Sequence, residues 1–518
     1  MKKTQVYIFL ALIISFGFFL RIYNIENVPP GIYPDEAVNG LDALEATEGN
    51  WQWFYPANNG REGLFMNLIA LCFKLFGVSI LTLKLPAIIF GTLTILGTYL
   101  FAKELFRNER IGLISSFLVA TSFWAINFSR ISFRANMLPV ILVFSFYFLA
   151  RGLRTKKWTD FALGGFIFGL GLHTYISFRI APAILIVALI ALIINRRHFL
   201  QEYWKNILFF FFFFLISSAP MLYTFFISHP EYLESRSASI SVFSLEANGG
   251  HPIKSFLKSF SLSLLKYNFW GDQNWRHNFP PYPLLDPITG IAFMFGLIYV
   301  IWKFFHLATL RFFKKIHDEK IKNYLILLAS FFFMLAPEFL TAEGNPHALR
   351  AIGTLPFVFI FSALTFNYLL EYVEKLFPNF KKIIYFLFIL IFAFIGIFNS
   401  VKYHLVWAKK PQTAEAFEKI IIDIEKYIQT ISPEKEIFLL AGNMQRVPLK
   451  FFNWKNQNFH NLHPTEIDNI SPNDHADFVI IFMDYYKDDI IKNINLRFPR
   501  MQLEEKKGNF GQVFYILK

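Results

Sequence analysis

Long apolar runs recur through the first 400 residues, and they constrain the fold more than any other feature. Stretches of about 20 apolar residues with few charges are membrane-spanning helices in most proteins. Only 17% of the residues are charged, against about a quarter in soluble domains. We predict eleven spanning helices, near residues 5–22, 84–102, 111–128, 137–151, 160–176, 180–195, 207–227, 289–305, 323–340, 351–373 and 382–400. The predicted fold is therefore mainly α, a polytopic transmembrane helical bundle.

The basic residues indicate how the bundle lies in the membrane. The net charge of +13 would suggest nucleic acid for a soluble protein, but here Lys and Arg gather in short loops between apolar runs. Such loops stay on the cytoplasmic side, so we expect a lipid bilayer and no nucleic acid as partner. The N-terminus has a basic start and an apolar core but no small-residue cleavage site, which predicts an uncleaved first helix. The only cysteine, Cys72, excludes an intrachain disulfide.

The segment 63–79 is the ambiguous one, because it has about the minimum length for a span and contains Lys74. If it does not cross, all five basic loops lie on the same side as the N-terminal "MKK"; if it crosses, all five oppose it. The first arrangement satisfies the positive-inside rule in every loop. We therefore predict that 63–79 is an interfacial helix on the outer membrane surface. The five loops are 103–110, 151–158, 195–206, 311–323 and 374–382.

This topology predicts a plasma (inner) membrane protein with a cytoplasmic N-terminus and two large external loops, 23–83 and 228–288. Residues 1–400 form the membrane domain, and residues 401–518 form a small extracytoplasmic α/β domain. In the latter, "TAEAFEKIIIDIEKYI" has apolar residues at helical spacing. The runs "EIFLLAG" and "DFVIIFM" read as strands, and "MQLEEKKGNFGQVFYIL" reads as a hairpin around Gly508 and Asn509.

Two adjacent carboxylates, Asp35 and Glu36, follow the first predicted helix in "GIYPDEAVNGLDAL". Acidic residues are common in the first turn of a helix, and the pattern fits such a start equally well. Other polar residues favour a functional interpretation, because they fall at outer helix ends, where loops should be poor in arginine. They are Arg61, Glu62, Arg130, Arg134, His173, Tyr175, Arg179, His347 and Arg350.

A carboxylate beside a cationic pocket suggests one class of reaction. Arg61, Arg130, Arg134 and Arg350 are the candidates for binding a lipid phosphate at the membrane surface. The carboxylate would take the proton of an acceptor hydroxyl or amine, and the arginines would stabilise the departing phosphate. A site facing outward excludes cytoplasmic nucleotide sugars, and the sequence has no Rossmann glycine fingerprint.

The residues resemble the GT-C type glycosyltransferases, in particular the bacterial branch related to protein O-mannosyltransferases and lipid A aminoarabinose transferases. The resemblance rests on "YPDEA", "GREGLF", "ALCFKLFG" and "LKLPAIIFGTLTILGTYLFAKELF", and it covers roughly residues 5–400. Two later stretches support it, "GDQNWRHNFPPYPLLDPITG" (271–290) and "NPHALRAIGTLPFVF" (345–359).

The resemblance implies a polyprenyl-phosphate-sugar donor, an outward-facing site and inversion at the anomeric carbon. The family's first-loop acidic residue matches Asp35, the implied base, while Glu36 would orient or cap. "REGLF" stands where the aminoarabinose transferases carry a Glu-Lys-Pro-Pro pattern, so Arg61 is the candidate cation there. The resemblance implies no catalytic metal and no cofactor, since the lipid-linked sugar is a substrate. The C-terminal domain matches nothing whose role can be transferred.

The stretch 271–290 is either a rigid proline-rich loop or a loop packed over the cavity, with Arg276 or His277 touching donor or acceptor. His173 and His347 could be metal ligands in principle, but neither has a second ligand at His-x-x-x-His spacing. We expect them, with Glu62, Tyr175 and Arg179, to be polar residues of the substrate cavity.

Two other classes of function are alternatives to a glycosyltransferase. A transporter or flippase for lipid-linked sugars would use the arginines to guide an anionic lipid, but paired interrupted helices in two halves are not evident. A scaffold would need one or two spans rather than eleven. The sequence leaves the sugar open, and the envelope acceptor can be protein, lipid or polysaccharide.

Overall fold

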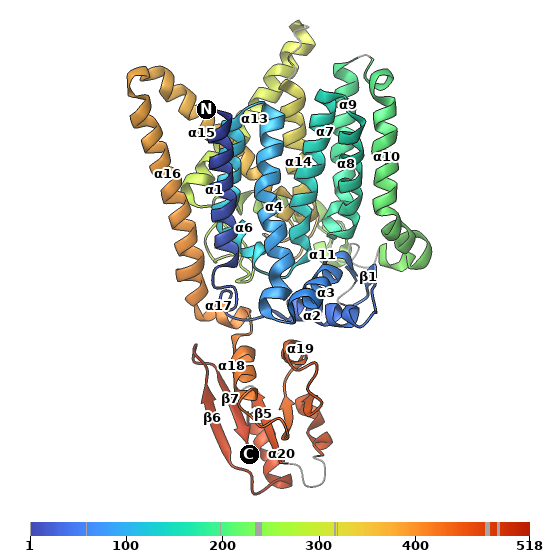
Figure 1. Cartoon of the computed structure of the whole chain (residues 1–518), viewed down its shortest axis with the longest axis vertical. Coiled ribbons are helices and arrows are strands. Elements are labelled where there is room, and N and C mark those ends of the chain that lie inside the picture. The colour runs from blue at the N-terminus through green and yellow to red at the C-terminus, as the bar shows by residue number, and fades with distance from the viewer. Residues whose placement is uncertain are drawn as a thin grey trace.

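The computed structural model describes residues 2–57, 60–196, 198–233, 241–314, 318, 320–471, 477–483 and 487–518, with only the backbone described at residues 232, 233, 489 and 495. Long helices run side by side, and a small α/β domain lies beyond one end of them (Figure 1). The N-terminus lies at the opposite end of the bundle from this domain (Figure 1).

The predicted fold class is confirmed. Among the described residues, nine helices are long and apolar enough to cross a membrane. They are α1 (Lys3–Ile22), α4 (Ile80–Phe106), α7 (Met137–Thr155), α9 (Ala181–Asn195), α10 (Phe199–Tyr223), α13 (Pro287–Lys314), α14 (Lys320–Phe339), α15 (Leu355–Leu376) and α16 (Lys381–Val401), five of them lengthened by short 3₁₀ or π turns.

The other two predicted spans are helical but irregular. Residues 111–128 form α5 (Glu109–Thr121) and α6 (Phe123–Ser129), which meet at a 61° bend and count as one broken span. Ser122 between them has an extended backbone, which ends one helix and begins the next. Residues 160–176 form the 13-residue helix α8 (Trp158–Leu170), which continues into the 3₁₀ turn η2 (Gly171–His173), whereas the next turn, η3 (Ile176–Ile180), leads into α9.

The five basic loops lie together at one end of the bundle, as the charge argument requires. A chain of side-chain contacts links each loop to the next. These contacts are Arg110–Glu374 (3.3 Å), Arg154–Glu104 (2.7 Å), Lys156–Glu202 (2.5 Å), Arg311–Asn195 and, to a carbonyl, Asn323–Leu105 (2.7 Å).

The loop 23–83 covers the other end of the bundle. It forms α2 (Pro34–Thr47), a two-residue hairpin of β1 (Phe54–Tyr55) and β2 (Arg61–Glu62), and α3 (Leu64–Phe76). Helices α2 and α3 lie across the end of the bundle rather than along it (Figure 1). At 13 residues, α3 is too short to span about 30 Å of hydrocarbon. This agrees with the predicted interfacial position of 63–79.

The described residues of the loop 228–288 contain three short helices. They are η5 (Pro230–Leu233), α11 (Leu245–Asn248) and α12 (Pro252–Leu265). Helix α12 packs on the end of α14, where the Ser259 hydroxyl donates to the carbonyl of Thr341 (3.0 Å).

The C-terminal domain has the predicted α/β character. Its five-stranded sheet has the order β4-β3-β5-β7-β6, with β3 parallel to both β4 and β5. The predicted strands are β3 (Glu436–Leu440) and β5 (Phe478–Met483), and the predicted hairpin is β6 (Leu503–Lys507) with β7 (Val513–Leu517). The sequence did not indicate β4 (Phe459–Leu462), reached through α19 (Asn443–Phe452); α20 (Lys487–Arg497) follows β5.

Two boundaries in this region differ from the prediction. The last span continues to Lys409, so the domain begins near 410 rather than 401. The helix expected over 413–428 is divided into α17 (Pro411–Ala416) and α18 (Lys419–Ile428), because Glu418 adopts a left-handed backbone with φ of 50°. A residue with a side chain adopts this conformation at a cost of about 1–2 kcal/mol.

The domain is packed onto the first external loop. Phe451 of α19 is buried in the same apolar cluster as residues of α2, α3 and α4. A Cβ on Gly40 of α2 would lie 2.6 Å from the Phe451 ring. A Cβ on Gly31 would lie 2.0 Å from the carbonyl oxygen of Phe417. The two glycines therefore permit the close approach of the domain to the segment that carries Asp35.

Arg130, the residue after α6, joins the bundle to the start of the first loop. Its fully buried guanidinium donates to four carbonyl oxygens, those of Leu20, Arg21, Tyr23 and Val28, at 2.6–2.9 Å. The carbonyls at a helix C-terminus lack partners within the helix, so Arg130 supplies donors for the end of α1.

We expect Arg130→Gln to destabilise the fold by at least about 3 kcal/mol, because it leaves several buried carbonyls without donors. The measurement is thermal unfolding of purified protein in one detergent. Arg130→Lys is the matched control, since its ammonium can replace part of the contacts and should lie between the two. Equal stability of Arg130→Gln and wild type would contradict this role.

Candidate functional site

The adjacent carboxylates Asp35 and Glu36 lie at the start of α2, where Pro34 is the first helical residue and Tyr33 is the N-cap. Successive residues of a helix point about 100° apart, and the two carboxylates have different surroundings as a result. Asp35 is half-buried, whereas Glu36 is fully buried.

Glu36 holds the backbone in place. Its two carboxylate oxygens accept from the N–H of Ser132 (2.8 Å) and the N–H of Tyr33 (3.2 Å), and the Lys84 ammonium lies 3.9 Å away. Burial raises the pKa of Glu36, while Lys84 and the two N–H groups oppose that shift. These contacts are those of a residue that caps the start of α2 and orients the segment around Asp35, whereas a catalytic contact of Glu36 stays a prediction.

Asp35 points to a different set of groups. It hydrogen-bonds the side chain of Tyr33, whose pKa is raised by burial and then by the Asp35 charge. The Tyr33 hydroxyl therefore stays protonated and donates to the carboxylate. The guanidinium of Arg276 lies 4.0 Å from the centre of the Tyr33 ring.

Arg276 is held by the proline-rich loop 271–290. Its Nε donates to Asn274 Oδ1 (3.1 Å), and its carbonyl accepts from Asn127 Nδ2 (2.7 Å). The charge of Arg276 also acts on Glu418 at the start of the C-terminal domain, whose pKa is raised mainly by burial. The alternative in which this loop packs over the site is therefore the one that the structure favours.

A second group of charges is formed around Arg61 and Glu62 of β2, with Asp42 of α2 and Arg134. Arg61 forms an ion pair with Asp42 and donates to Asn39. Arg134 and Glu62 form another pair (2.6 Å). The guanidinium of Arg134 lies 5.7 Å from the ring of Tyr175.

His173 and Arg179 lie beside this group. The charge of Glu62 acts on both. His173 Nε2 lies 2.9 Å from the carbonyl oxygen of Ser217, and Arg179 lies 4.7 Å from the centre of the Phe225 ring. The structure thus brings together six predicted residues, from the three separate stretches 61–62, 134 and 173–179.

Arg130 is the clear correction. Four of its five N–H groups reach backbone carbonyls at the end of α1, and the residue is fully buried. The arginine predicted to bind donor phosphate is structural. An arginine that binds phosphate and an arginine that binds backbone carbonyls can both stand at a helix end. The sequence therefore did not distinguish the two roles.

The remaining predicted residues lie where the loops after α12 and α14 meet. Arg350 is half-buried and donates to the carbonyl of Glu343 (2.5 Å). His277 Nδ1 lies 3.1 Å from Asp272 Oδ2, which also accepts from the N–H of Ala348 (2.7 Å). The rings of His277 and His347 have centroids 4.8 Å apart.

Burial and neighbouring groups shift the pKa values of Asp272 and His347 in this cluster. Burial opposes the charge of Asp272, but the hydrogen bond from His277 and nearby donors outweigh it, so the pKa of Asp272 lies below its ordinary value. Burial, and then the neighbouring His277, lower the pKa of His347 well below its ordinary value. His347 is therefore neutral at pH 7.

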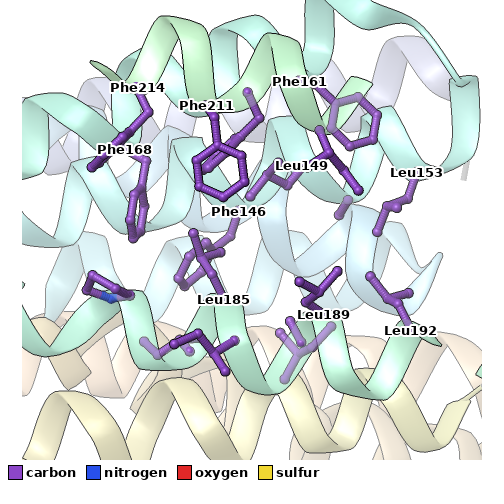
Figure 2. A pocket seen from close by; sticks show the side chains of 18 of the residues that line it. Phe146, Leu149, Leu153, Phe161, Phe168, Leu185, Leu189, Leu192, Phe211 and Phe214 are labelled. Atoms are coloured by element: carbon purple, nitrogen blue, oxygen red, sulfur yellow. The ribbon is translucent and has the colours of Figure 1, made fainter. Parts of the chain in front are cut away.

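An apolar groove runs between α8, α9 and α10 (Figure 2). Its volume is about 490 Å³, and its lining is made almost wholly of Phe, Leu, Ile and Ala side chains. Figure 2 shows Leu185, Leu189 and Leu192 of α9 facing Phe161, Phe168 and Phe211 across it. The groove extends along α9 from Pro182, three residues after Arg179, so one end adjoins the second group of charges.

Comparison with solved structures identifies the fold. Over 100% of this chain and 98% of the other, it is similar to ArnT from Cupriavidus metallidurans bound to undecaprenyl phosphate, with a TM-score of 0.52 and 11% identity. It is also similar to the Archaeoglobus fulgidus oligosaccharyltransferase tethered with an acceptor peptide, with a TM-score of 0.52 and 15% identity, over 90% of this chain and 64% of that one. The archaeal oligosaccharyltransferase AglB, in complex with an inhibitory peptide and a dolichol-phosphate, gives a TM-score of 0.51 at 13% identity, over 99% of this chain and 74% of that one. The fold is thus that of the GT-C type membrane glycosyltransferases.

The sequence agrees with the fold. Residues 64–223 match the family described as dolichyl-phosphate-mannose-protein mannosyltransferase. No curated protein sequence matches the chain significantly. The predicted resemblance is confirmed, because the chain has the fold of ArnT and part of its sequence matches the protein mannosyltransferase family.

Several residues of the site were not predicted. Tyr33 precedes Asp35 in the quoted motif, and its place as N-cap was the available signal. Asn39 and Asp42 follow at one-turn spacing on α2, which a helical wheel brings to one face. Glu418 had no local signal, because only the tertiary docking of the C-terminal domain brings it near Arg276.

The two carboxylates should respond differently to amide substitution. Glu36→Gln replaces an oxygen that accepts from a backbone N–H with a donor, so we expect a loss of about 1–3 kcal/mol in stability. Asp35→Asn leaves those two hydrogen bonds intact and should change stability by less than about 1 kcal/mol. Thermal unfolding of the two variants side by side tests the distinction, and the reverse order of stabilities would refute it.

Proposed function

We propose that this protein is an inverting glycosyltransferase that moves a sugar from a polyprenyl-phosphate donor to an acceptor on the outer face of the plasma membrane. The observation that carries the proposal is Asp35, a half-buried carboxylate at a helix start that hydrogen-bonds Tyr33 beside Arg276. A base next to a cation is the minimum that this reaction needs.

The reaction balances with these two groups. The acceptor oxygen attacks the anomeric carbon and forms the new C–O bond, while the bond from that carbon to the phosphate oxygen breaks. Asp35 takes the acceptor proton, and the phosphate leaves with the bonding electron pair. The leaving phosphate needs no proton near pH 7, so cations are sufficient to stabilise it.

Arg276 is the cation best placed for the phosphate. It lies on the Tyr33 ring, within the group that surrounds Asp35, whereas Arg61 and Arg134 are each paired with a carboxylate. Those two pairs can open when an anionic headgroup arrives, since a phosphate competes with the carboxylate for the same guanidinium. Arg350 remains a proposed contact of the phosphate from the loop after α14.

The apolar groove along α9 fits the lipid part of the donor. Its lining offers almost no polar atoms, and one end adjoins the segment that carries His173, Tyr175 and Arg179. A prenyl chain lying there would bury apolar surface, and its phosphate would emerge beside Arg134 and Arg179. The undecaprenyl phosphate bound by ArnT, with the same fold, supports this class of ligand.

The arrangement of the two ends supports the outward orientation. All five basic loops gather at the end opposite to Asp35, and such loops remain in the cytoplasm. The C-terminal domain then faces outside and lies next to the acceptor side of the site. We propose an envelope protein, lipid or polysaccharide as acceptor.

The test uses purified protein in nanodiscs with a radiolabelled polyprenyl-phosphate sugar and cell-envelope extract as acceptor source. Wild type should release polyprenyl phosphate, and Asp35→Asn should release it about 10²–10⁴-fold more slowly, the usual range for loss of a general base. Glu45→Gln is the matched control, because Glu45 is an exposed carboxylate on the same helix.

Two outcomes would overturn the proposal. A fully active Asp35→Asn would remove the assignment of the base. Movement of intact labelled lipid across sealed vesicles, without cleavage, would identify a transporter instead.

We expect Arg276→Gln to lower kcat by about 10²–10³-fold, the range seen when one donor to a developing charge is removed. Arg276→Lys should recover only part of this, because an ammonium cannot hold phosphate in two-point contact. The same release assay measures both, with Arg446→Gln in the C-terminal domain as control. A change confined to stability, with kcat unaltered, would show Arg276 to be structural.

A further inference from the structure

The cluster of Asp272, His277 and His347 has no part in the transfer reaction proposed above. It is formed by two loops that are 70 residues apart in the sequence, after α12 and after α14. One ligand-type atom from each residue lies within 4.8 Å of those of the other two. Asp272 and His277 are buried, and His347 is half-buried. Such convergence of buried side chains requires a physical reason.

We propose that Asp272, His277 and His347 form a binding site for a divalent transition-metal ion of the Zn²⁺ type. Two imidazoles and one carboxylate are ligands that Zn²⁺ commonly takes in proteins. The sequence predicted no metal, because no pair of these residues has the spacing of a helical ligand motif. Tertiary structure alone assembles the set.

The distances fit with a small adjustment. Zinc–ligand bonds of about 2.0–2.1 Å in a tetrahedral site place ligand atoms roughly 3.4 Å apart. His277 Nδ1 and Asp272 Oδ2 are 3.1 Å apart. The third atom, on His347, lies within 4.8 Å and must move inward. Its hydrogen bond from the Arg350 N–H is long, at 3.4 Å, so rotation of the ring costs little.

The groups around the ligands are suited to hold them. Asp272 accepts from the N–H of Ala348 (2.7 Å) and from the N–H of Asn274 (2.8 Å), which fix its carboxylate. The His347 backbone N–H donates to Glu338 Oε1 (2.9 Å), and Glu338 forms a buried ion pair with Lys266. Hydrogen bonds to the ligands and their segments of this kind orient metal-binding side chains.

A metal-free Asp–His hydrogen bond is the simpler interpretation. It accounts for Asp272 and His277, because a neutral imidazole donates from Nδ1 to the carboxylate. It gives no reason for a second imidazole, that of His347, against the first at a centroid distance of 4.8 Å. When an ion binds, His277 takes its other neutral tautomer, and the lone pairs of Nδ1 and Oδ2 both face the metal.

The ion would tie the loop that carries Arg276 to the loop that carries Arg350. Three protein ligands also leave a coordination position open. The site is independent of the proposed reaction, since metal binding can be measured on the protein without a donor or an acceptor.

The experiment measures metal content and affinity on the full chain, without a histidine tag, in detergent. Zn²⁺ is added to chelator-treated protein, and bound metal is measured after gel filtration. We expect one Zn²⁺ per chain for wild type. Asp272→Asn and His347→Gln should each weaken binding by more than about 100-fold, since even partners outside the ligand set contribute 10–100-fold.

His173→Gln is the matched control, because His173 is a buried histidine outside the cluster, and it should bind as wild type does. Co²⁺ supplies a readout that needs no variant: absorption bands of a four-coordinate ion with nitrogen ligands are expected for wild-type protein. Substoichiometric Zn²⁺ in wild type, a Co²⁺ spectrum like that of the aqueous ion, or equal loss in His173→Gln would each overturn the proposal.

Discussion

The pairing of charges buried inside the bundle positions the segment that carries Asp35, the centre of the candidate site. An unpaired charge in a low-dielectric interior costs several kcal/mol, so each buried arginine or glutamate has its own set of partners. Arg130 fixes the end of α1 through four carbonyls, and Glu36 fixes the start of α2 through two N–H groups. Between these two anchors, the chain has only the short segment from Tyr23 to Tyr33 in which to turn. Asp35 then follows directly, with its carboxylate directed away from the Glu36 contacts.

The fold was largely predictable because it follows from patterns that the membrane imposes. Hydropathy predicted the eleven helical regions. The loop charges predicted that 63–79 does not span, and it forms a helix of 13 residues, too short to cross the hydrocarbon. The exceptions are local. The bend at Ser122 and the break at Glu418 occur within continuous apolar or amphipathic patterns, so periodicity gave no sign of either. Both depend on tertiary contacts, which no single stretch of sequence contains.

The sequence predicted many of the residues that belong to the candidate site, but it did not predict what each side chain contacts. Arg130 and Arg134 are four residues apart at the same end of the bundle, yet one binds backbone carbonyls and the other binds Glu62. Asp35 and Glu36 are adjacent, yet one is half-buried and the other enclosed. In each pair the chemistry of the side chain is alike and only its direction differs. That direction is set by the neighbouring elements, and the sequence of the pair itself does not contain it.

The C-terminal domain also depends on these anchors. Phe451 packs against Gly40 on α2, and the charge of Arg276 acts on Glu418 at the start of the domain. The domain is therefore attached to both of the segments that meet at Tyr33. A shift of the domain would move α2 and the Arg276 loop together, because its contacts join them. Any molecule that approaches Asp35 from this end of the bundle meets a surface to which the helical bundle and the domain both contribute.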